Sequence, residues 1–167
     1  MKWMYFPKNK SVTDDLLQVV SIFEKHKIEI DSEQKNLVSN EVLNIVAPDL
    51  KNLGYAIEFG KKRKEKVHIP VLYGECGASL LSFDADAYHK NKEIVIEVEA
   101  GQAVDNYKFL KDFFEACCMD NTTYLCIAVR KVYGKQNDFE KVCKHFDALY
   151  SSNRLSIPLK GILIIGY

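Results

Sequence analysis

Two neighbouring stretches of the sequence decide the fold, Phe83-Asp84-Ala85-Asp86-Ala87-Tyr88 and Ile94-Val95-Ile96-Glu97-Val98-Glu99. Acidic and apolar residues alternate in both, which predicts two β-strands, over residues 79–88 and 93–100, joined by a turn. Successive side chains on a strand point to opposite faces. If the two strands pair as a hairpin, four carboxylates share one face: Asp84, Asp86, Glu97 and Glu99.

The position of the turn sets which carboxylates stand opposite each other. A turn centred on Lys90-Asn91 places Asp84 opposite Glu97, whereas a turn centred on Asn91-Lys92 places Asp86 there. Asparagine tolerates the positive φ that tight turns require, so the sequence allows both registers.

Carboxylates gathered on one face, about 4–5 Å apart, repel one another unless some are protonated or a cation lies between them. Mg²⁺ suits such a site because it prefers oxygen ligands and needs only one or two carboxylates besides water and phosphate. A bound metal can activate water and stabilise charge on a phosphodiester. The plainer interpretation is that the acidic face is the solvent-facing side of an edge hairpin.

The rest of the chain alternates between helical and strand patterns. Helices are expected over 13–27, 32–46, 105–118 and 138–150, and further strands over 55–59, 67–73, 124–132 and 161–167. This order predicts an α/β fold with a mixed central β-sheet. At 100° per residue, Glu41 falls within the apolar stripe of the second helix, so its carboxylate is expected to face inward.

Composition limits the class of protein. With 167 residues, 47% of them hydrophobic, and 23 basic residues against 23 acidic ones, the chain suits one globular domain. These values argue against a disordered tail, a collagen, a coiled coil or a protein that coats nucleic acid through bulk charge. Five cysteines without a Cys-x-x-Cys pair favour reduced thiols. The longest apolar run, Ile162–Ile165, is far shorter than a membrane span, so a cytoplasmic protein without membrane contact is expected.

The acidic hairpin resembles the PD-(D/E)xK nuclease superfamily, which has the restriction-endonuclease-like fold. That motif is an Asp on one strand and Glu-x-Lys on the next, often with a Glu from a preceding helix. The resemblance makes Asp84 or Asp86 the motif Asp, places Glu97 and Glu99 in the second half, and makes Glu41 the helix acid. It implies an α/β restriction-endonuclease-like fold with helices on both sides of a mixed sheet.

The sequence also departs from this motif, because Glu99 replaces the usual lysine and no proline precedes either Asp. Some restriction enzymes of the superfamily carry Glu or Gln at that position. A Glu there must act as a metal ligand, a water-orienting group or a base. Lys108 or Lys111, on the next helix, is a candidate source of positive charge.

The resemblance implies a Mg²⁺-dependent or Mn²⁺-dependent endonuclease that hydrolyses DNA, of which restriction enzymes are one type. Asp84, Asp86 and Glu97 would be metal ligands, and Glu99 and Glu41 would complete the catalytic set. A basic run offers phosphate contacts, and its members are Lys61, Lys62, Arg63, Lys64 and Lys66. A single domain that cuts both strands would act as a homodimer.

The expected domain plan is one unit over residues 1–167. It consists of an N-terminal extension with one helix over 1–31, a motif-bearing core over 32–132, and a final helix and strand over 133–167. Two other functions fit the same residues. One is a catalytically silent nuclease-like module that binds DNA or assembles with proteins. The other is a plain α/β interaction domain with an acidic, wet hairpin.

Overall fold

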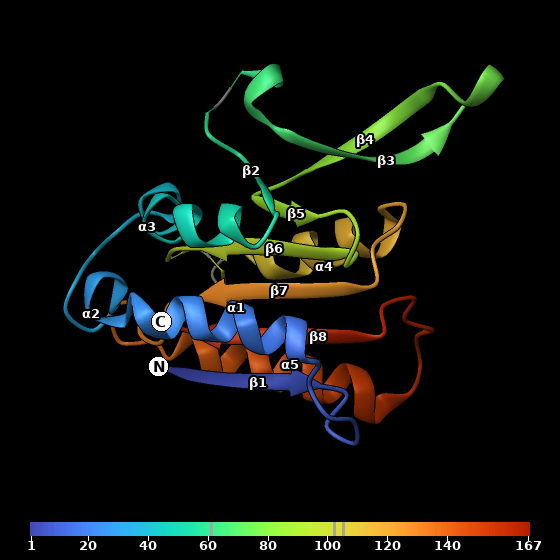
Figure 1. Ribbon diagram of the computed structural model, residues 1–167. Coiled ribbons are helices and arrows are strands. Elements are labelled where there is room, and N and C mark those ends of the chain that lie inside the picture. The colour runs from blue at the N-terminus through green and yellow to red at the C-terminus, as the bar shows by residue number, and fades with distance from the viewer. Residues whose placement is uncertain (61, 102, 105) are drawn as a thin grey trace.

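The computed structural model of the chain describes residues 1–60, 62–101, 103–104 and 106–167. The strands of its main β-sheet are β1 (Lys2–Phe6), β2 (Ala56–Ile57), β5 (Ala87–His89), β6 (Ile94–Glu99), β7 (Tyr124–Val129) and β8 (Gly161–Gly166). Among the described residues they lie in the order β1-β8-β7-β6-β5-β2 (Figure 1). β6, β7 and β8 are parallel, and the other neighbours in the sheet are antiparallel. The prediction of a mixed central sheet is confirmed.

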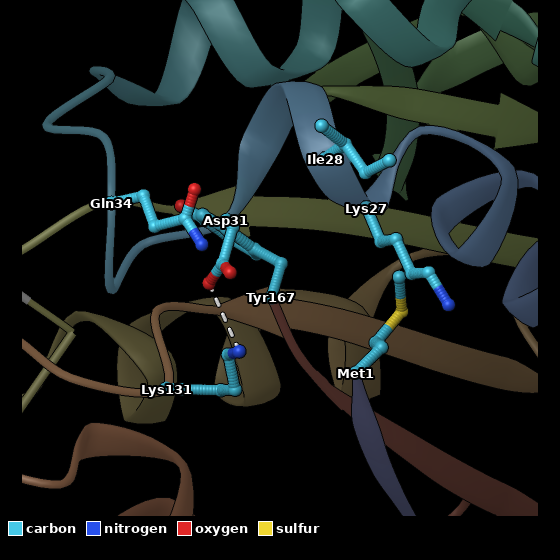
Figure 2. Close-up of a pocket in the computed structure, with 7 residues that line it drawn as sticks. All are labelled: Met1, Lys27, Ile28, Asp31, Gln34, Lys131 and Tyr167. Atoms are coloured by element: carbon cyan, nitrogen blue, oxygen red, sulfur yellow. Dashed lines mark ion pairs between the residues drawn. The ribbon is translucent and has the colours of Figure 1, made fainter.

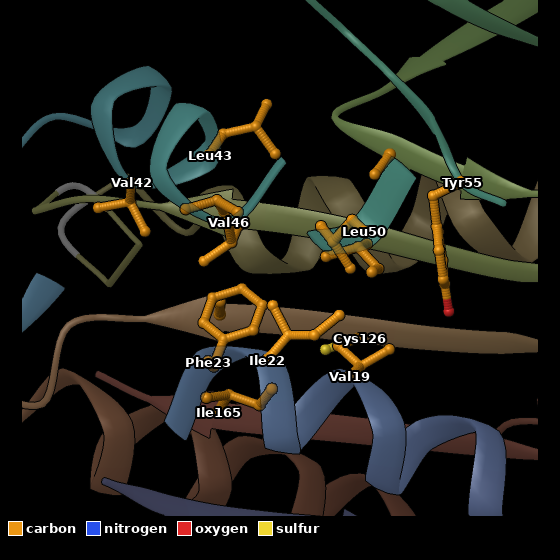
Figure 3. Close-up of a cluster of buried hydrophobic side chains, with 14 of the residues drawn as sticks. Val19, Ile22, Phe23, Val42, Leu43, Val46, Leu50, Tyr55, Cys126 and Ile165 are labelled. Carbon is orange, nitrogen blue, oxygen red and sulfur yellow. The ribbon is translucent and has the colours of Figure 1, made fainter. Parts of the chain in front are cut away.

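Helices cover both faces of this sheet (Figure 1). One face carries α1 (Asp14–Lys25), the short α2 (Lys27–Ile30) and α3 (Ser39–Asn52), and the other carries α4 (Lys108–Cys118) and α5 (Asp138–Ser152). Each face buries its own apolar cluster. Figure 3 shows the first of them, where Phe23 of α1 and Val46 of α3 meet Cys126 of β7 and Ile165 of β8. Burial of these apolar stripes supplies the main favourable free energy of such a layered fold.

The alternation of side chains along β6 decides where its carboxylates point. Ile94, Ile96 and Val98 belong to the cluster under α1 and α3, whereas Val95 belongs to the cluster under α4 and α5. Glu97 and Glu99 have the parity of Val95, so they share one face, as the sequence predicts, and that face is the one that α4 covers.

The expected strand over 79–88 is divided into two. β4 (Ser79–Ala85) pairs with β3 (Val67–Tyr73) in a separate two-stranded sheet, which projects from the main sheet (Figure 1). The chain then bends at Asp86 and enters the main sheet as β5. This bend interrupts the alternation of side chains, so Asp84 and Asp86 do not share a face as residues two apart on one strand would.

The N-terminal part of the chain differs from expectation. Residues 1–31 are part of the fold rather than an appendage, because β1 extends the sheet beside β8 and α1 packs in the core. The second long helix begins at Ser39, not near residue 32, and it continues through Pro48. Residues before it form a loop, since the Ser32 hydroxyl donates to the main-chain oxygen of Tyr167 and Asp31 pairs with Lys131.

Two smaller points concern α4 and membranes. The helix expected from Asp105 begins at Lys108, and Asp105 itself lies outside the described residues. Within the described part of the chain, no helix combines the length and apolarity needed to cross a membrane.

Candidate functional site

The pairing of β5 with β6 fixes the register that the sequence left open. Ala87 pairs with Ile96 and Tyr88 with Val95, which corresponds to the turn centred on Asn91-Lys92. One step further along this register, Asp86 lies beside Glu97. The main-chain N–H of Val98 donates to Asp86 Oδ2 at 2.8 Å and holds the aspartate in place.

Four acidic side chains meet in the space between β6 and α4, and we call Asp86, Glu97, Glu99 and Asp112 the carboxylate cluster. Asp112 comes from α4 and is only 6% exposed, and the Glu99 side chain is 13% exposed. Glu97 interacts electrostatically with Asp86 and Asp112, and Asp112 interacts with Glu99 and Asp86. The cluster thus gathers four ionisable carboxyl groups in a place that water reaches poorly.

Burial is the main reason that these carboxyl groups hold protons tightly. Desolvation, followed by repulsion from Asp86 and Asp112, raises the pKa of Glu97 well above its ordinary value. Desolvation also raises the pKa of Asp86 to about 6 and that of Asp112 to about 8, with repulsion from Glu99 adding to both. The pKa of Glu99 is raised by burial, although Lys108 and Lys111 oppose this shift.

Two oxygens of the cluster are left without hydrogen-bond donors among the described residues. They are Glu99 Oε2 and Asp112 Oδ2, both buried. The nearest recorded cation to the first is Lys108, whose Nζ lies 3.7 Å from Glu99 Oε2. Lys111 is paired with Glu115 at 2.9 Å. A buried acceptor without a donor is unfavourable by about 1–3 kcal/mol, so protons or a cation would stabilise this arrangement.

The donor set of the cluster suits a hard divalent cation, because every ligand it offers is an oxygen. In the described part of the chain, however, no three His, Cys, Asp or Glu side chains stand close enough together to hold a metal ion. A Mg²⁺ ion held by one or two carboxylates and several waters remains compatible with this geometry, since Mg²⁺ usually keeps much of its water shell.

Asp84 does not belong to the cluster, and the expectation that it shares a face with Asp86, Glu97 and Glu99 is wrong. Its side chain is 46% exposed on the projecting hairpin and lies 2.6 Å from His68 Nδ1. The physical reason is the bend at Asp86, which separates β4 from the main sheet.

Glu41 is also placed differently from the prediction, because it is exposed rather than inward-facing. It is the third residue of α3, and its Oε2 accepts a hydrogen bond of 2.8 Å from the main-chain N–H of Val38. It therefore satisfies one of the N–H groups at the start of the helix, as a capping-box glutamate does.

This placement predicts that Glu41→Ala lowers the free energy of unfolding by about 0.5–1 kcal/mol through loss of the cap. Because the Glu41 side chain is exposed on α3, which covers the opposite face of the sheet from α4, we expect no change in metal binding. Urea unfolding measures the first quantity and calorimetric titration with Mn²⁺ measures the second. A loss of metal affinity with unchanged stability would contradict the capping role.

The basic segment lies between β2 and β3, at the start of the projecting hairpin. Lys62, Arg63 and Lys64 are exposed, while Lys61 lies outside the described residues. Lys66 is less available than expected, because its Nζ is 2.6 Å from the buried Glu58 carboxylate. Glu58, whose main-chain N–H donates to the main-chain oxygen of Asp86, was not predicted as part of the site.

Asp112 is the other residue that sequence reasoning missed. Leu110 and Phe114 of this helix are apolar but exposed. The buried residues are Phe109, Asp112 and Ala116, which follow one another at intervals of three and four. An acidic residue at helical spacing between buried apolar ones is the pattern that could have identified it.

Comparison with protein-family models, curated proteins and solved structures found no match to this chain. The site is interpreted from its own chemistry.

Proposed function

We propose that the chain is a Mg²⁺-dependent endonuclease that hydrolyses phosphodiester bonds in DNA. The observation that carries this proposal is the register of β5 and β6, which places Asp86 beside Glu97, with Glu99 on the same face. This arrangement has the order and parity of the motif that the sequence resembles. The raised pKa values of the buried carboxyl groups are an additional feature typical of functional sites.

The residues of the cluster divide into distinct roles. Asp86 and Glu97 would hold the metal, which supplies an activated water and stabilises developing negative charge when bound. Glu99 orients the attacking water. Lys108, 3.7 Å from Glu99, provides the positive charge that a lysine at position 99 would have carried. Asp112, on α4, raises the pKa of Glu97 by electrostatic repulsion.

Exposed cations on the segment between β2 and β3 support a polyanionic substrate. Lys62, Arg63 and Lys64 are exposed, whereas Lys66, further along the same segment, is paired with Glu58. Contacts of this kind release counterions from the nucleic acid and weaken as salt is added. The overall charge of zero is compatible with a basic flank around an acidic site.

Cleavage of supercoiled plasmid DNA tests this proposal. We expect the purified chain to cut it with Mg²⁺ or Mn²⁺ and to be inactive in EDTA. Direct conversion to linear DNA indicates a homodimer that cuts both strands, whereas nicked circles indicate a monomer that cuts one. A chain that leaves the plasmid intact with either metal contradicts the proposal.

The two aspartates of the motif provide a matched pair of variants. Asp86→Asn is expected to weaken Mn²⁺ binding at least tenfold, because Asp86 lies in the cluster, while Asp84→Asn should leave it within twofold. Calorimetric titration measures both affinities. Equal weakening by the two substitutions, or weakening by Asp84→Asn alone, would assign the metal to the hairpin instead.

A second candidate function is a catalytically silent nuclease-like module that binds DNA or assembles with other proteins. It is favoured by the occupation of the motif lysine position by Glu99, which is paired with Lys108. In that case the wild-type chain binds Mn²⁺ no better than Asp86→Asn does, yet still binds DNA in EDTA.

A further inference from the structure

A second group of charged residues lies where β7 and β8 end, next to the end of β6 that carries Glu99. Arg130 directly follows β7 and is only 5% exposed. Its Nη1 donates to Asn36 Oδ1 at 2.6 Å, its Nη2 donates to the main-chain oxygen of Leu37, and the guanidinium lies 5.2 Å from the ring centroid of Tyr133. All of these partners are neutral.

The next residue, Lys131, has carboxylate partners that balance its charge. Figure 2 shows Lys131 paired with Asp31, at 2.9 Å, and Glu33 lies 3.6 Å from the same nitrogen. Among the described residues, by contrast, no recorded ion pair includes Arg130. The charges of Arg130 and of the buried Asp138 both act on the Tyr167 hydroxyl.

Arg130 lines a pocket of about 630 Å³ between the loop that precedes α3 and the loop that follows β7. The Nε of Arg130 is buried and has no hydrogen-bond partner among the described residues. Lys35 adds a second cation to the pocket, and Glu33, the one acidic residue among the described lining residues, pairs with Lys131. Other lining residues with polar atoms are Ser32, Gln34, Asn36 and Tyr133.

We propose that this pocket, which we call the Arg130 pocket, binds a phosphate group. A buried guanidinium that has no carboxylate partner among the described residues is unfavourable by itself, and its planar fork matches phosphate oxygens. Lys35 and the side-chain amides of Gln34 and Asn36 supply further donors. The pocket also lies outside the carboxyl ends of parallel strands, where open α/β sheets commonly bind ligands.

The same phosphate chemistry can come from free phosphate and nucleotides or from the backbone of a nucleic acid. The proposal does not depend on nuclease activity, because it involves neither the carboxylate cluster nor a metal. Its test is therefore done in EDTA, so that loss of cleavage and loss of phosphate binding are measured separately.

Thermal unfolding in EDTA, at constant ionic strength set with chloride, tests the pocket with inorganic phosphate and with a short oligonucleotide. At about 100 times the dissociation constant, we expect the Tm of the wild type to rise by about 5–10 °C. Arg130→Met should abolish this rise. Arg154→Met, at an exposed arginine, and Lys131→Met, at the balanced lysine, should retain it.

The two probes separate the sources of the phosphate. A rise with inorganic phosphate that depends on Arg130 assigns free phosphate or a nucleotide, and a rise with the oligonucleotide alone assigns a backbone phosphate. If Arg130→Met does not fold, Lys35→Ala at the rim replaces it and should weaken binding about tenfold. A Tm that neither probe raises, or a rise that survives both substitutions, overturns the proposal.

Discussion

Glu97→Gln is expected to reduce Mg²⁺-dependent cleavage about 1000-fold and, at the same time, to raise the thermal stability of the metal-free protein. The loss follows because a metal contributes several kcal/mol of transition-state stabilisation, and each 1.4 kcal/mol corresponds to a factor of ten. The gain follows because burial and repulsion from Asp86 and Asp112 raise the pKa of Glu97, so the acid loses stability relative to the amide once the pH exceeds the pKa of the unfolded chain.

Opposite changes in activity and stability separate a metal ligand from a residue that merely supports the fold. Plasmid cleavage measures the first and thermal unfolding at pH 7 in EDTA measures the second. Glu140→Gln, an exposed carboxylate on α5, is the control and should change neither appreciably. A Glu97→Gln variant that cuts as well as the wild type would remove Glu97 from the proposed mechanism.

Asp112→Asn is expected to stabilise the metal-free protein by about 2–4 kcal/mol at pH 8, with little effect near pH 4. The pKa of Asp112 rises from 3.8 to about 8 on folding, so the folded chain binds this proton more tightly than the unfolded chain does. Stability from protonated Asp112 is complete below about pH 4 and is lost as the pH rises towards about 8. The amide has no such proton to lose.

Urea unfolding of the wild type and Asp112→Asn at several pH values between 4 and 9 measures this difference. The two free-energy curves should diverge as the pH rises. Glu75→Gln, at the exposed tip of the projecting hairpin, should follow the wild type throughout. Curves that stay parallel would show that Asp112 ionises in the folded protein as it does in the unfolded chain.

Most of the elements that build the site follow from local patterns. The apolar alternation of β6 predicted its two faces correctly, because one of them had to enter the core under α1 and α3. The first helix was expected from residue 13, and Thr13 caps α1 with a hydroxyl that accepts from the Leu16 N–H. The turn residues permitted two registers but could not select one, since both satisfy the same local backbone preference.

The errors arose where one segment depends on a distant partner. Asp84 lies outside the site because β4 pairs with β3. The alternation of residue types within 79–88 does not predict that pairing. Glu41 also lies outside the site. Its helix begins seven residues later than expected, after a loop held by the hydrogen bond from the Ser32 hydroxyl to the Tyr167 main-chain oxygen. Asp112 lies in the site because α4 packs with this face inward.

The sequence by itself determined an α/β chain in which Glu97 and Glu99 share one face of a strand, because side-chain alternation is a local property of the backbone. Only the tertiary structure decided that Asp86 and Asp112 complete the carboxylate cluster and that Arg130 lies in a separate pocket. Those choices depend on strand pairing, helix rotation and the burial of charge. Each of them joins residues that are far apart in the chain, where local preference has no influence.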